Sequence, residues 1–484
     1  MSFFIRRKKD ENKHVKAKKG RNHSEAVGRK KDGPPRKKKK IVDEEIESDS
    51  DIENDEGAEK QAFSSEEEEE ETAQEKKLRL TKQYLAKMEA HEAELQEDEA
   101  GLKDAISHRL KEELLEQTGR LYKEVADKYL PPDPGEIKVL RGHQLSVTCV
   151  VISPDSQCIF SAAKDCSIIK WNVEQGKKMH VIHGGRKGTE KRHTGHTGHV
   201  LSLAISSDGK YLASGDANKL IHIWNPDNCE LIHTFEGHRG PVTGLSFRKG
   251  SHQLFSASHD RFVKVWNLDE MAYVETLIGH QDAITGIDSL TRERALTCGG
   301  RDNSIRIWKI IEESQLLFLG HGSSIDCVSL INESNFVSGA DDNSISLWGV
   351  MKKKPLFTVK NAHGSQNPNS AQNPDTTQNK QTSVYQENWI TSISSMQYTD
   401  LIASAGSKDG CVRFWKCGED FKSLKQIFSV PLKGFVNCVK FSGDGQFVVA
   451  GIGQEHRLGR WWRLKEAKNS VCVIPLHKKE KEKT

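Results

Sequence analysis

Residues 237–266 read GHRGPVTGLSFRKGSHQLFSASHDRFVKVW, and the fold prediction starts from this stretch. It opens with a Gly-His pair, closes with a tryptophan and carries Asp260 six residues before that tryptophan. Short runs rich in Val, Leu and Phe lie between these marks, and Gly, Ser and Asp bound them. That composition is typical of short β-strands joined by tight turns.

The same marks recur along the chain. Tryptophans stand at seven comparable places, separated by 53, 42, 42, 40, 67 and 46 residues: Trp171, Trp224, Trp266, Trp308, Trp348, Trp415 and Trp461. Gly-His pairs precede five of them, with their histidines at His143, His199, His238, His280 and His321. A period near 42 indicates a repeat architecture. The joint spacing resembles the WD-repeat family, whose repeats each form a four-stranded blade of a closed propeller.

The resemblance predicts an all-β fold, a seven-bladed WD-repeat β-propeller over residues 137–476. Its last repeat starts at Gly434-Phe435 and closes on Trp461-Trp462, with Glu455 in place of the usual aspartate. We expect one of these tryptophans to fill the blade core and the other to remain free for a contact. Residues 137–140 or 470–475 can supply the strand that closes the ring, and we expect 137–140 to do so. Residues 183–198 and 361–388 interrupt the period, which predicts two surface loops.

The rest of the chain is strongly charged. Residues 1–40 hold seventeen Lys/Arg against four Asp/Glu, and residues 41–71 hold sixteen Asp/Glu against one lysine. Such blocks bury little, so residues 1–71 are predicted to be a disordered tail, basic over 1–40 and acidic over 41–71. This tail contains a basic cluster, Arg36, Lys37, Lys38, Lys39 and Lys40. Such a cluster can act as a nuclear import signal, bind RNA phosphates or only keep the chain soluble, and we favour nuclear import. Serines in the acidic block are hypothesised to be phosphorylated.

Two further segments flank the propeller. Apolar residues recur at spacings of four and seven from Leu102 to Tyr129, which predicts a helical segment over residues 72–130. Its apolar stripe covers either the propeller or a partner chain, and the sequence leaves both open. Residues 477–484 are expected to form a charged C-terminal tail. No apolar run reaches the length of a transmembrane helix and no signal peptide is present, so we expect an intracellular protein without membrane contact.

Several side chains imitate a catalytic triad, yet we interpret them as structural. The pattern occurs three times, as His143, Ser161, Asp165 and Trp171, as His238, Ser256, Asp260 and Trp266, and as His321, Ser338, Asp342 and Trp348. A catalytic centre has no reason to recur around a ring, whereas a hydrogen-bond network that ties a loop to each blade does.

Other chemistry finds little support in the sequence. Histidines crowd residues 180–199 without a cysteine or carboxylate at ligand spacing, which disfavours zinc. The chain also lacks GxxxxGK[ST], HExxH and GxSxG motifs. We therefore expect no enzyme, no metal, no cofactor and no small-molecule substrate.

The candidate contact surface is the face that carries the Gly-His turns. The residue before each repeat aspartate should lie there, and most of these residues carry a positive charge or can gain one: Lys164, His259, Arg301 and Lys408. Arg239, which follows the third Gly-His pair, should lie on the same face. In the last repeat, Arg457, Arg460 and Arg463 are further candidates for RNA or protein contacts, although a role in closing the ring explains them as well. Arg and Lys set register on a nucleic acid through its phosphates. An ordinary mixed surface is the alternative.

Several stretches match more narrowly than the repeat. They are ETAQEKKLRL (71–80), VLRGHQLSVTCV (139–150), IFSAAKDCSIIKW (159–171), AISSDGKYLASGD (204–216) and GQEHRLGRWWRLKEAKNSVCVIPL (453–476). Together they resemble the family of U3 small nucleolar RNA-interacting WD-repeat proteins. The resemblance implies a non-catalytic subunit of the U3 small nucleolar ribonucleoprotein, located in the nucleus and nucleolus.

The same resemblance implies the partners. They are the box B/C region of U3 small nucleolar RNA, the core box C/D proteins and other proteins of the small-subunit processome, and the role is pre-rRNA processing to 18S rRNA. The competing hypothesis is a protein-interaction propeller, such as a ubiquitin-ligase substrate receptor or a chromatin-associated scaffold, because one fold serves both uses.

Overall fold

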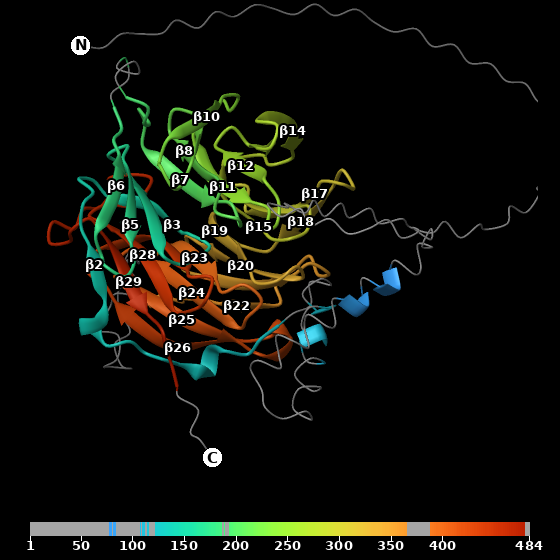
Figure 1. The fold of residues 1–484 in the computed structure, drawn as a ribbon. Helices are drawn as coiled ribbons and strands as arrows, with labels where there is room; N and C mark the ends of the chain where they lie inside the picture. The colour runs from blue at the N-terminus through green and yellow to red at the C-terminus, as the bar shows by residue number, and fades with distance from the viewer. Residues whose placement is uncertain are drawn as a thin grey trace, which may run out of the picture. The chain divides into compact units, whose positions relative to one another are not determined.

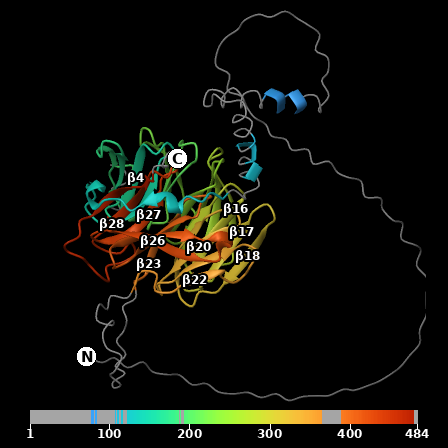
Figure 2. The ribbon, with the colours of Figure 1, turned by 90° about the horizontal axis from the view of Figure 1, so that it is seen from below.

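The computed structural model describes residues 77–79, 81–83, 107, 109–111, 114–115, 122–185, 188, 193–364 and 388–479. Within these ranges, seven four-stranded antiparallel sheets follow one another along the chain and stand radially as the blades of a propeller (Figure 1). Seen from below, the colours of the chain run around the ring in order (Figure 2). The predicted seven-bladed propeller is therefore confirmed. Residues 1–71, including the import cluster Arg36 to Lys40, lie outside the described residues.

Six blades take all four strands from one continuous stretch of chain. Blade 1 contains β3 (Val147–Ile152), β4 (Cys158–Ala163), β5 (Ile168–Asn172) and β6 (Lys178–Ile182). Blade 2 contains β7 (Val200–Ile205), β8 (Leu212–Asp216), β9 (Ile221–Trp224) and β10 (Leu231–Phe235). Blade 3 contains β11 (Val242–Phe247), β12 (Gln253–Ser258), β13 (Phe262–Asn267) and β14 (Ala272–Ile278). Blade 4 contains β15 (Ile284–Ser289), β16 (Arg294–Gly299), β17 (Ser304–Lys309) and β18 (Ser314–Leu319).

Blades 5 and 6 carry the second insertion between them. Blade 5 contains β19 (Ile325–Leu330), β20 (Asn335–Ala340), β21 (Ile345–Gly349) and β22 (Phe357–Val359). Blade 6 contains β23 (Ile390–Ser395), β24 (Leu401–Gly406), β25 (Cys411–Cys417) and β26 (Leu424–Pro431), with a short 3-10 turn at Glu419–Phe421. In every blade the first strand lies at the ring axis and the fourth lies at the rim.

The two ends of the chain build blade 7 together. Its inner strands are β27 (Phe435–Phe441), β28 (Phe447–Gly453) and β29 (Ser470–Pro475), and its outer strand is β2 (Lys138–Leu140). Lys138 pairs with Val473 and Leu140 with Val471, so teal β2 lies beside red β29 in Figure 1. The expectation that residues 137–140 close the ring is confirmed. Pairing with β2 covers the edge of β29, which would otherwise be open to pairing with another chain.

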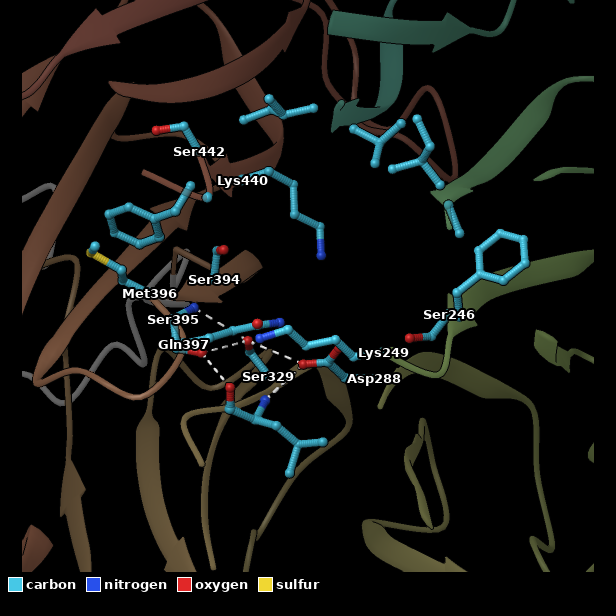
Figure 3. A pocket seen from close by; sticks show the side chains of 18 of the residues that line it. Ser246, Lys249, Asp288, Ser329, Ser394, Ser395, Met396, Gln397, Lys440 and Ser442 are labelled. Carbon is cyan, nitrogen blue, oxygen red and sulfur yellow. Dashed lines mark hydrogen bonds between the residues drawn. The ribbon is translucent and has the colours of Figure 1, made fainter. Parts of the chain in front are cut away.

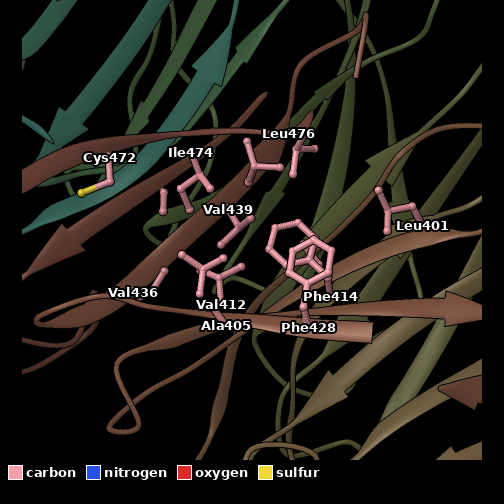
Figure 4. Close-up of a cluster of buried hydrophobic side chains, with 14 of the residues drawn as sticks. Leu401, Ala405, Val412, Phe414, Phe428, Val436, Val439, Cys472, Ile474 and Leu476 are labelled. Atoms are coloured by element: carbon pink, nitrogen blue, oxygen red, sulfur yellow. The ribbon is translucent and has the colours of Figure 1, made fainter. Parts of the chain in front are cut away.

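Apolar side chains between neighbouring blades form the core. Every residue of β28 is buried, as a strand packed on both faces requires. Between blades 6 and 7, Val412 and Phe414 of one blade meet Val436, Val439 and Ile474 of the other (Figure 4). The same arrangement recurs around the ring, so each blade stabilises its neighbours as well as itself.

The predicted flanking segments need two corrections. The described residues between 77 and 115 are helical, but residues 122–130 are not: they form a 3-10 turn at Ala126–Lys128 and the strand β1 (Tyr129–Leu130). Tertiary contacts override the helical pattern here, because the Asp400 carboxylate accepts hydrogen bonds from the amides of Val125 and Ala126. The expected C-terminal tail starts later than residue 477, since β30 (His477–Lys478) pairs with β1. No helix in the described part of the chain is long and apolar enough to cross a membrane.

Candidate nucleic-acid interface

The polar network predicted for the repeats is present, and blade 3 shows its form. His238 lies with Nε2 2.7 Å from Ser256 Oγ and Nδ1 2.9 Å from Asp260 Oδ2, and Trp266 Nε1 donates to the same serine oxygen at 2.8 Å. This pattern fits a neutral imidazole that donates from Nδ1 to the carboxylate and accepts at Nε2 from the hydroxyl. Burial works to raise the pKa of Asp260, but hydrogen bonds from His238 and from backbone amides outweigh it and lower the pKa to about 2.

Equivalent histidine–hydroxyl–tryptophan contacts occur in six blades. Blades 1 and 5 use the predicted residues, with His143 and Trp171 on Ser161 and with His321 and Trp348 on Ser338. In blade 1, His143 Nδ1 lies 3.4 Å from Asp165. In blade 5, His321 Nδ1 instead lies 3.5 Å from Ser344 Oγ, while Asp342 accepts from the Ser344 amide. A sixfold arrangement of this kind holds turns in place, as the structural interpretation requires.

The sequence prediction is wrong for the network histidine of blade 2 and misses the one of blade 6. Blade 2 uses the buried His196, with Ser214, Asp216 and Trp224, whereas the expected His199 contacts the Lys164 carbonyl. The signal was available, because His196 precedes its serine by 18 residues, as His238 does. Blade 6 uses His363, which is also buried and bonds to Ser404 and Asp409. Residues 193–199 and 361–364 therefore belong to blades, and most of the remainder of the two predicted surface loops lies outside the described residues.

Blade 7 departs from the repeat more than expected. Neither Trp461 nor Trp462 fills its core, because its third strand is Ser470–Pro475. Ile474 pairs with Val448 at the place where Trp266 pairs with Leu254 in blade 3. Residues 454–469, which we call the blade 7 loop, therefore connect β28 to β29 on the upper face, the face that carries the histidine turns.

The blade 7 loop reaches the ring axis through Arg457. Its guanidinium donates to the Asp326 carbonyl of blade 5 at 3.1 Å. Arg457 and Leu458 also face Leu201, Thr243 and Thr285, which belong to blades 2, 3 and 4. Burial raises the pKa of the Asp326 carboxyl to about 6, against the lowering effect of Arg457. This arginine therefore stands at the upper end of the central channel and ties the loop to the far side of the ring.

A second anchor holds the loop to blade 1. Lys164 Nζ donates to the carbonyls of His456 at 2.5 Å and Gly459 at 3.3 Å, and it lies 3.8 Å from the Glu455 carboxylate. Only 6% of Lys164 is exposed. Burial lowers its pKa, and Glu455 opposes that effect. Lys164 therefore positions the loop and is not available as the surface contact that the sequence pattern predicted.

Aromatic side chains hold the outer part of the loop. The Trp389 ring lies 5.0 Å from Trp462 and 5.8 Å from Trp461, between ring centroids, and His456 lies 5.9 Å from Trp461. The Lys408 ammonium stands 3.6 Å from the centroid of the Trp462 ring. Burial, with the nearby Arg457 and Lys164, lowers the pKa of His456 to about 3, so this imidazole is neutral. Trp461 remains 61% exposed despite these contacts.

The other predicted contacts divide by exposure. Arg239, His259 and Arg301 are exposed on the upper face. Arg460 and Arg463 have side chains 70% and 60% exposed, and both lie near the Glu455 carboxylate, at 3.0 Å and 3.9 Å. Lys408 is half-buried over Trp462, and Arg457 is committed to the channel. The structure thus brings Trp461, Arg460 and Arg463 together as an exposed patch, which we call the Trp461 patch.

The crowded histidines near residue 190 do not form a metal site in the part of the chain that the structure covers. No group of three or more His, Cys, Asp or Glu side chains suited to a metal ion occurs among the described residues. His196 is committed to the blade 2 network and His193 Nδ1 lies 3.0 Å from the Gly195 carbonyl. All ten cysteines are free thiols.

Comparison with known proteins agrees with this architecture. The model of the WD domain, G-beta repeat, matches residues 135–172, 189–225, 229–267, 271–309, 313–349, 379–416 and 422–458. The human U3 small nucleolar RNA-interacting protein 2 is 54% identical over 407 residues, which cover 84% of this chain and 83% of the human protein. Its mouse counterpart is 55% identical over the same shares.

A solved structure extends the agreement to three dimensions. The crystal structure of RRP9 WD40 repeats superposes with a TM-score of 0.67 at 55% sequence identity, and the match covers 72% of this chain and all of that one. With seven matched repeats, a closed ring and relatives of this similarity over most of its length, the chain belongs to the WD-repeat family that includes the U3 small nucleolar RNA-interacting proteins.

Proposed function

We propose that this chain is a non-catalytic RNA- and protein-binding subunit of the U3 small nucleolar ribonucleoprotein. In this proposal it recognises the box B/C region of U3 small nucleolar RNA together with the core box C/D proteins, and it supports pre-rRNA processing to 18S rRNA in the small-subunit processome. The nucleolus is then its place of action, and the basic cluster Arg36 to Lys40 serves nuclear import. The names and similarity of the relatives support the coarse part of this proposal.

The observation that carries the RNA contact is the Trp461 patch. RNA is read in sequence mainly where bases are unpaired, and such bases stack on exposed aromatic rings. Trp461 offers an exposed indole ring on a loop that Lys164 and Arg457 hold in place, so little ordering entropy is lost on binding. Arg460 and Arg463 belong to the same loop, both with exposed side chains near Glu455, and can meet phosphates of the bound RNA.

The rest of the upper face extends the contact. Arg239, His259 and Arg301 are exposed there, and the half-buried Lys408 lies over the Trp462 ring. Burial lowers the pKa of His259, with Arg457 acting in the same direction, so His259 acts as a neutral hydrogen-bonding group at neutral pH. The cationic residues are few, so phosphate contacts alone give limited affinity and the core proteins supply the remainder.

The test is crosslinking in cells followed by sequencing of the RNA attached to the wild-type chain and to Trp461→Ala. Loss of one stacked base costs about 1–3 kcal/mol, so recovery of U3 RNA should fall by roughly 5- to 150-fold. Tyr273→Ala is the matched control, because Tyr273 is an aromatic residue 49% exposed on the rim strand β14. Equal recovery with Trp461→Ala and wild type would remove the Trp461 patch from the interface, and absence of U3 RNA from the wild-type sample would refute the proposed function.

A further inference from the structure

A groove lies at the seam between blades 6 and 7, where the two ends of the chain meet. It has a volume of about 480 Å³, which is within the range of ligand sites in proteins. Its lining comes from the segment around β2, from the link between β26 and β27, from β28 and β29, and from the end of the blade 7 loop. We call it the blade 6–7 groove.

The floor of the blade 6–7 groove is apolar. Ile452 and Cys472 belong to the core between blades 6 and 7 and are almost fully buried. Ile137 and Leu432 pack against the same core and are half-buried, and Val139, in the same lining, is 47% exposed. An aliphatic side chain placed here would therefore extend an existing core and leave water.

Charged side chains complete the lining, and most of them are cations. Three cations and one acid line the groove, and all four are exposed: Arg141, Lys433, Lys468 and Glu466. Within the described part of the chain, none of these four side chains forms an ion pair or a hydrogen bond. The nearby Glu136 carboxylate is engaged with His477 Nε2 at 2.8 Å. The groove therefore keeps a positive balance even where Glu466 faces one of the cations.

The cavity at the lower end of the central channel differs in this respect. It has a volume of about 560 Å³ and lies among the ends of the innermost strands. Its polar groups already bond to one another: Ser329 Oγ lies 3.0 Å from Ser395 Oγ, and Asp288 Oδ2 accepts from the Leu330 amide at 2.8 Å (Figure 3). The blade 6–7 groove is the hollow whose charged groups are left for a ligand.

The walls of the blade 6–7 groove are held in place before any ligand arrives. On the blade 6 side, the Leu432 amide donates to the Gly410 carbonyl at 2.6 Å. On the blade 7 side, Gln454 Nε2 donates at 2.7 Å to the carbonyl of Ala467, which stands between the two charged residues of that wall. Binding therefore costs little ordering of the protein backbone.

This lining favours a peptide over a nucleic acid. Unpaired bases bind proteins largely by stacking on aromatic rings, and no aromatic residue lines the groove in the described part of the chain. An aliphatic side chain, in contrast, gains from the apolar floor in proportion to the area that it buries. Carboxylates of the same peptide can meet the exposed cations, which adds specificity and speeds association.

We propose that the blade 6–7 groove binds an acidic peptide segment of a partner protein. One aliphatic side chain of the peptide lies on the apolar floor, and neighbouring Asp or Glu side chains pair with Arg141, Lys433 and Lys468. This inference goes beyond the RNA contact and does not depend on it, because the groove shares no lining residue with the Trp461 patch.

Fluorescence anisotropy with the full chain tests the proposal. The labelled probe is a synthetic peptide with one leucine between short runs of Asp and Glu; two twins replace either the leucine with glycine or the acids with their amides. The acidic leucine peptide should bind, the glycine twin at least about tenfold more weakly and the amide twin at least about threefold more weakly. Failure of the acidic leucine peptide to bind, or equal binding of either twin, would overturn the proposal.

Competition with single-stranded oligouridine tests the other class of ligand. The measurement uses Trp461→Ala, so that RNA held by the Trp461 patch does not interfere. The peptide should stay bound, because the groove offers no ring on which a base can stack. Displacement of the peptide would assign the groove to RNA and overturn the proposal.

Variants locate the site. Lys433→Glu combined with Lys468→Glu should weaken binding of the acidic leucine peptide at least about tenfold, because two attractive charges become repulsive. Val139→Asp should weaken it as well, since it removes an apolar contact and adds an acid. Lys352→Glu combined with Lys353→Glu is the matched control, because both lysines are exposed between β21 and β22 and neither lines the groove.

Circular dichroism checks that each variant is folded. Unchanged affinity in the folded groove variants would refute the location. A loss of equal size in the control would show nonspecific charge attraction and refute the location as well.

Discussion

Replacing Lys164 with methionine separates a positioning role from a direct RNA contact. The sequence pattern places Lys164 among surface cations, yet its ammonium donates to two carbonyls of the blade 7 loop and is almost fully buried. Methionine keeps the apolar stem of the side chain and removes the charge and both hydrogen bonds. Glu455 retains Arg460 as an ion-pair partner, so no carboxylate is left without a counter-charge.

The structure gives the size of the expected effect. Each hydrogen bond to a charged group contributes about 1.5–3 kcal/mol. Methionine also relieves the cost of burying the Lys164 ammonium, which offsets part of the two contributions, so the combined loss is about 2–3 kcal/mol. The equilibrium for opening the blade 7 loop should therefore shift by roughly 30- to 150-fold. The strands of the propeller should stay folded, because blade 7 is closed by β2 and β29 and not by the loop, and the free energy of unfolding should fall by no more than this loss.

Limited trypsin digestion measures that opening, because Arg457, Arg460 and Arg463 offer cleavage sites within the loop. When opening is fast relative to cleavage, the rate follows the open population. We expect faster loop cleavage in Lys164→Met and a matching loss of affinity for U3 RNA. Arg301→Met is the control: it should lower RNA affinity and reduce the salt slope by about one, with no change in cleavage. Loss of RNA affinity in Lys164→Met with unchanged cleavage would make Lys164 a direct contact and refute the anchoring role.

Three further predictions test the fold. Ser256→Ala removes the buried partner of His238 Nε2 and of Trp266 Nε1, while His238 Nδ1 keeps Asp260, and it should cost about 2–4 kcal/mol in urea unfolding. A loss below about 0.5 kcal/mol would contradict the network. Asp260 has a depressed pKa of about 2 in the folded state, so its contribution to stability is present above about pH 5 and is lost as the pH falls from about 4 to 2. Asp260→Asn should therefore flatten the dependence of the free energy of unfolding on pH in that window. An unchanged dependence would contradict the assignment. Removal of residues 1–140 deletes β1 and β2, and size-exclusion chromatography should then show aggregated protein. Removal of residues 1–121 should leave a monomeric propeller. A monomeric 141–484 fragment would show that β2 is dispensable.

Much of the fold could be predicted because each repeat encodes its own blade. The histidine, serine and tryptophan that share one hydrogen-bonded centre lie within about 30 residues, and the β-type runs between them alternate with turns. The spacing of 18 residues between histidine and serine would also have identified His196. His363 could not be found in this way, since the insertion places it 41 residues before Ser404.

The candidate site was predicted less well, because its residues meet through contacts that no local pattern records. Lys164 and Arg301 occupy the same place in their repeats, yet one is buried beneath the blade 7 loop and the other is exposed. Because earlier repeats end on tryptophan, the sequence predicts that one of the paired tryptophans fills the core of blade 7. Ile474 takes that place instead, and the extra residues of the last repeat leave the sheet as a loop.

The sequence by itself determined the number of blades and the structural character of the repeated histidines, and it left two candidate strands for closing the ring. These features depend on side chains within one repeat, or on the simple requirement that a ring must close. The tertiary structure alone decided which cations reach solvent and where the tryptophans point. Lys164 meets His456 across 292 residues and Arg457 meets Asp326 across 131, and such contacts exist only once the ring brings distant blades together around its axis.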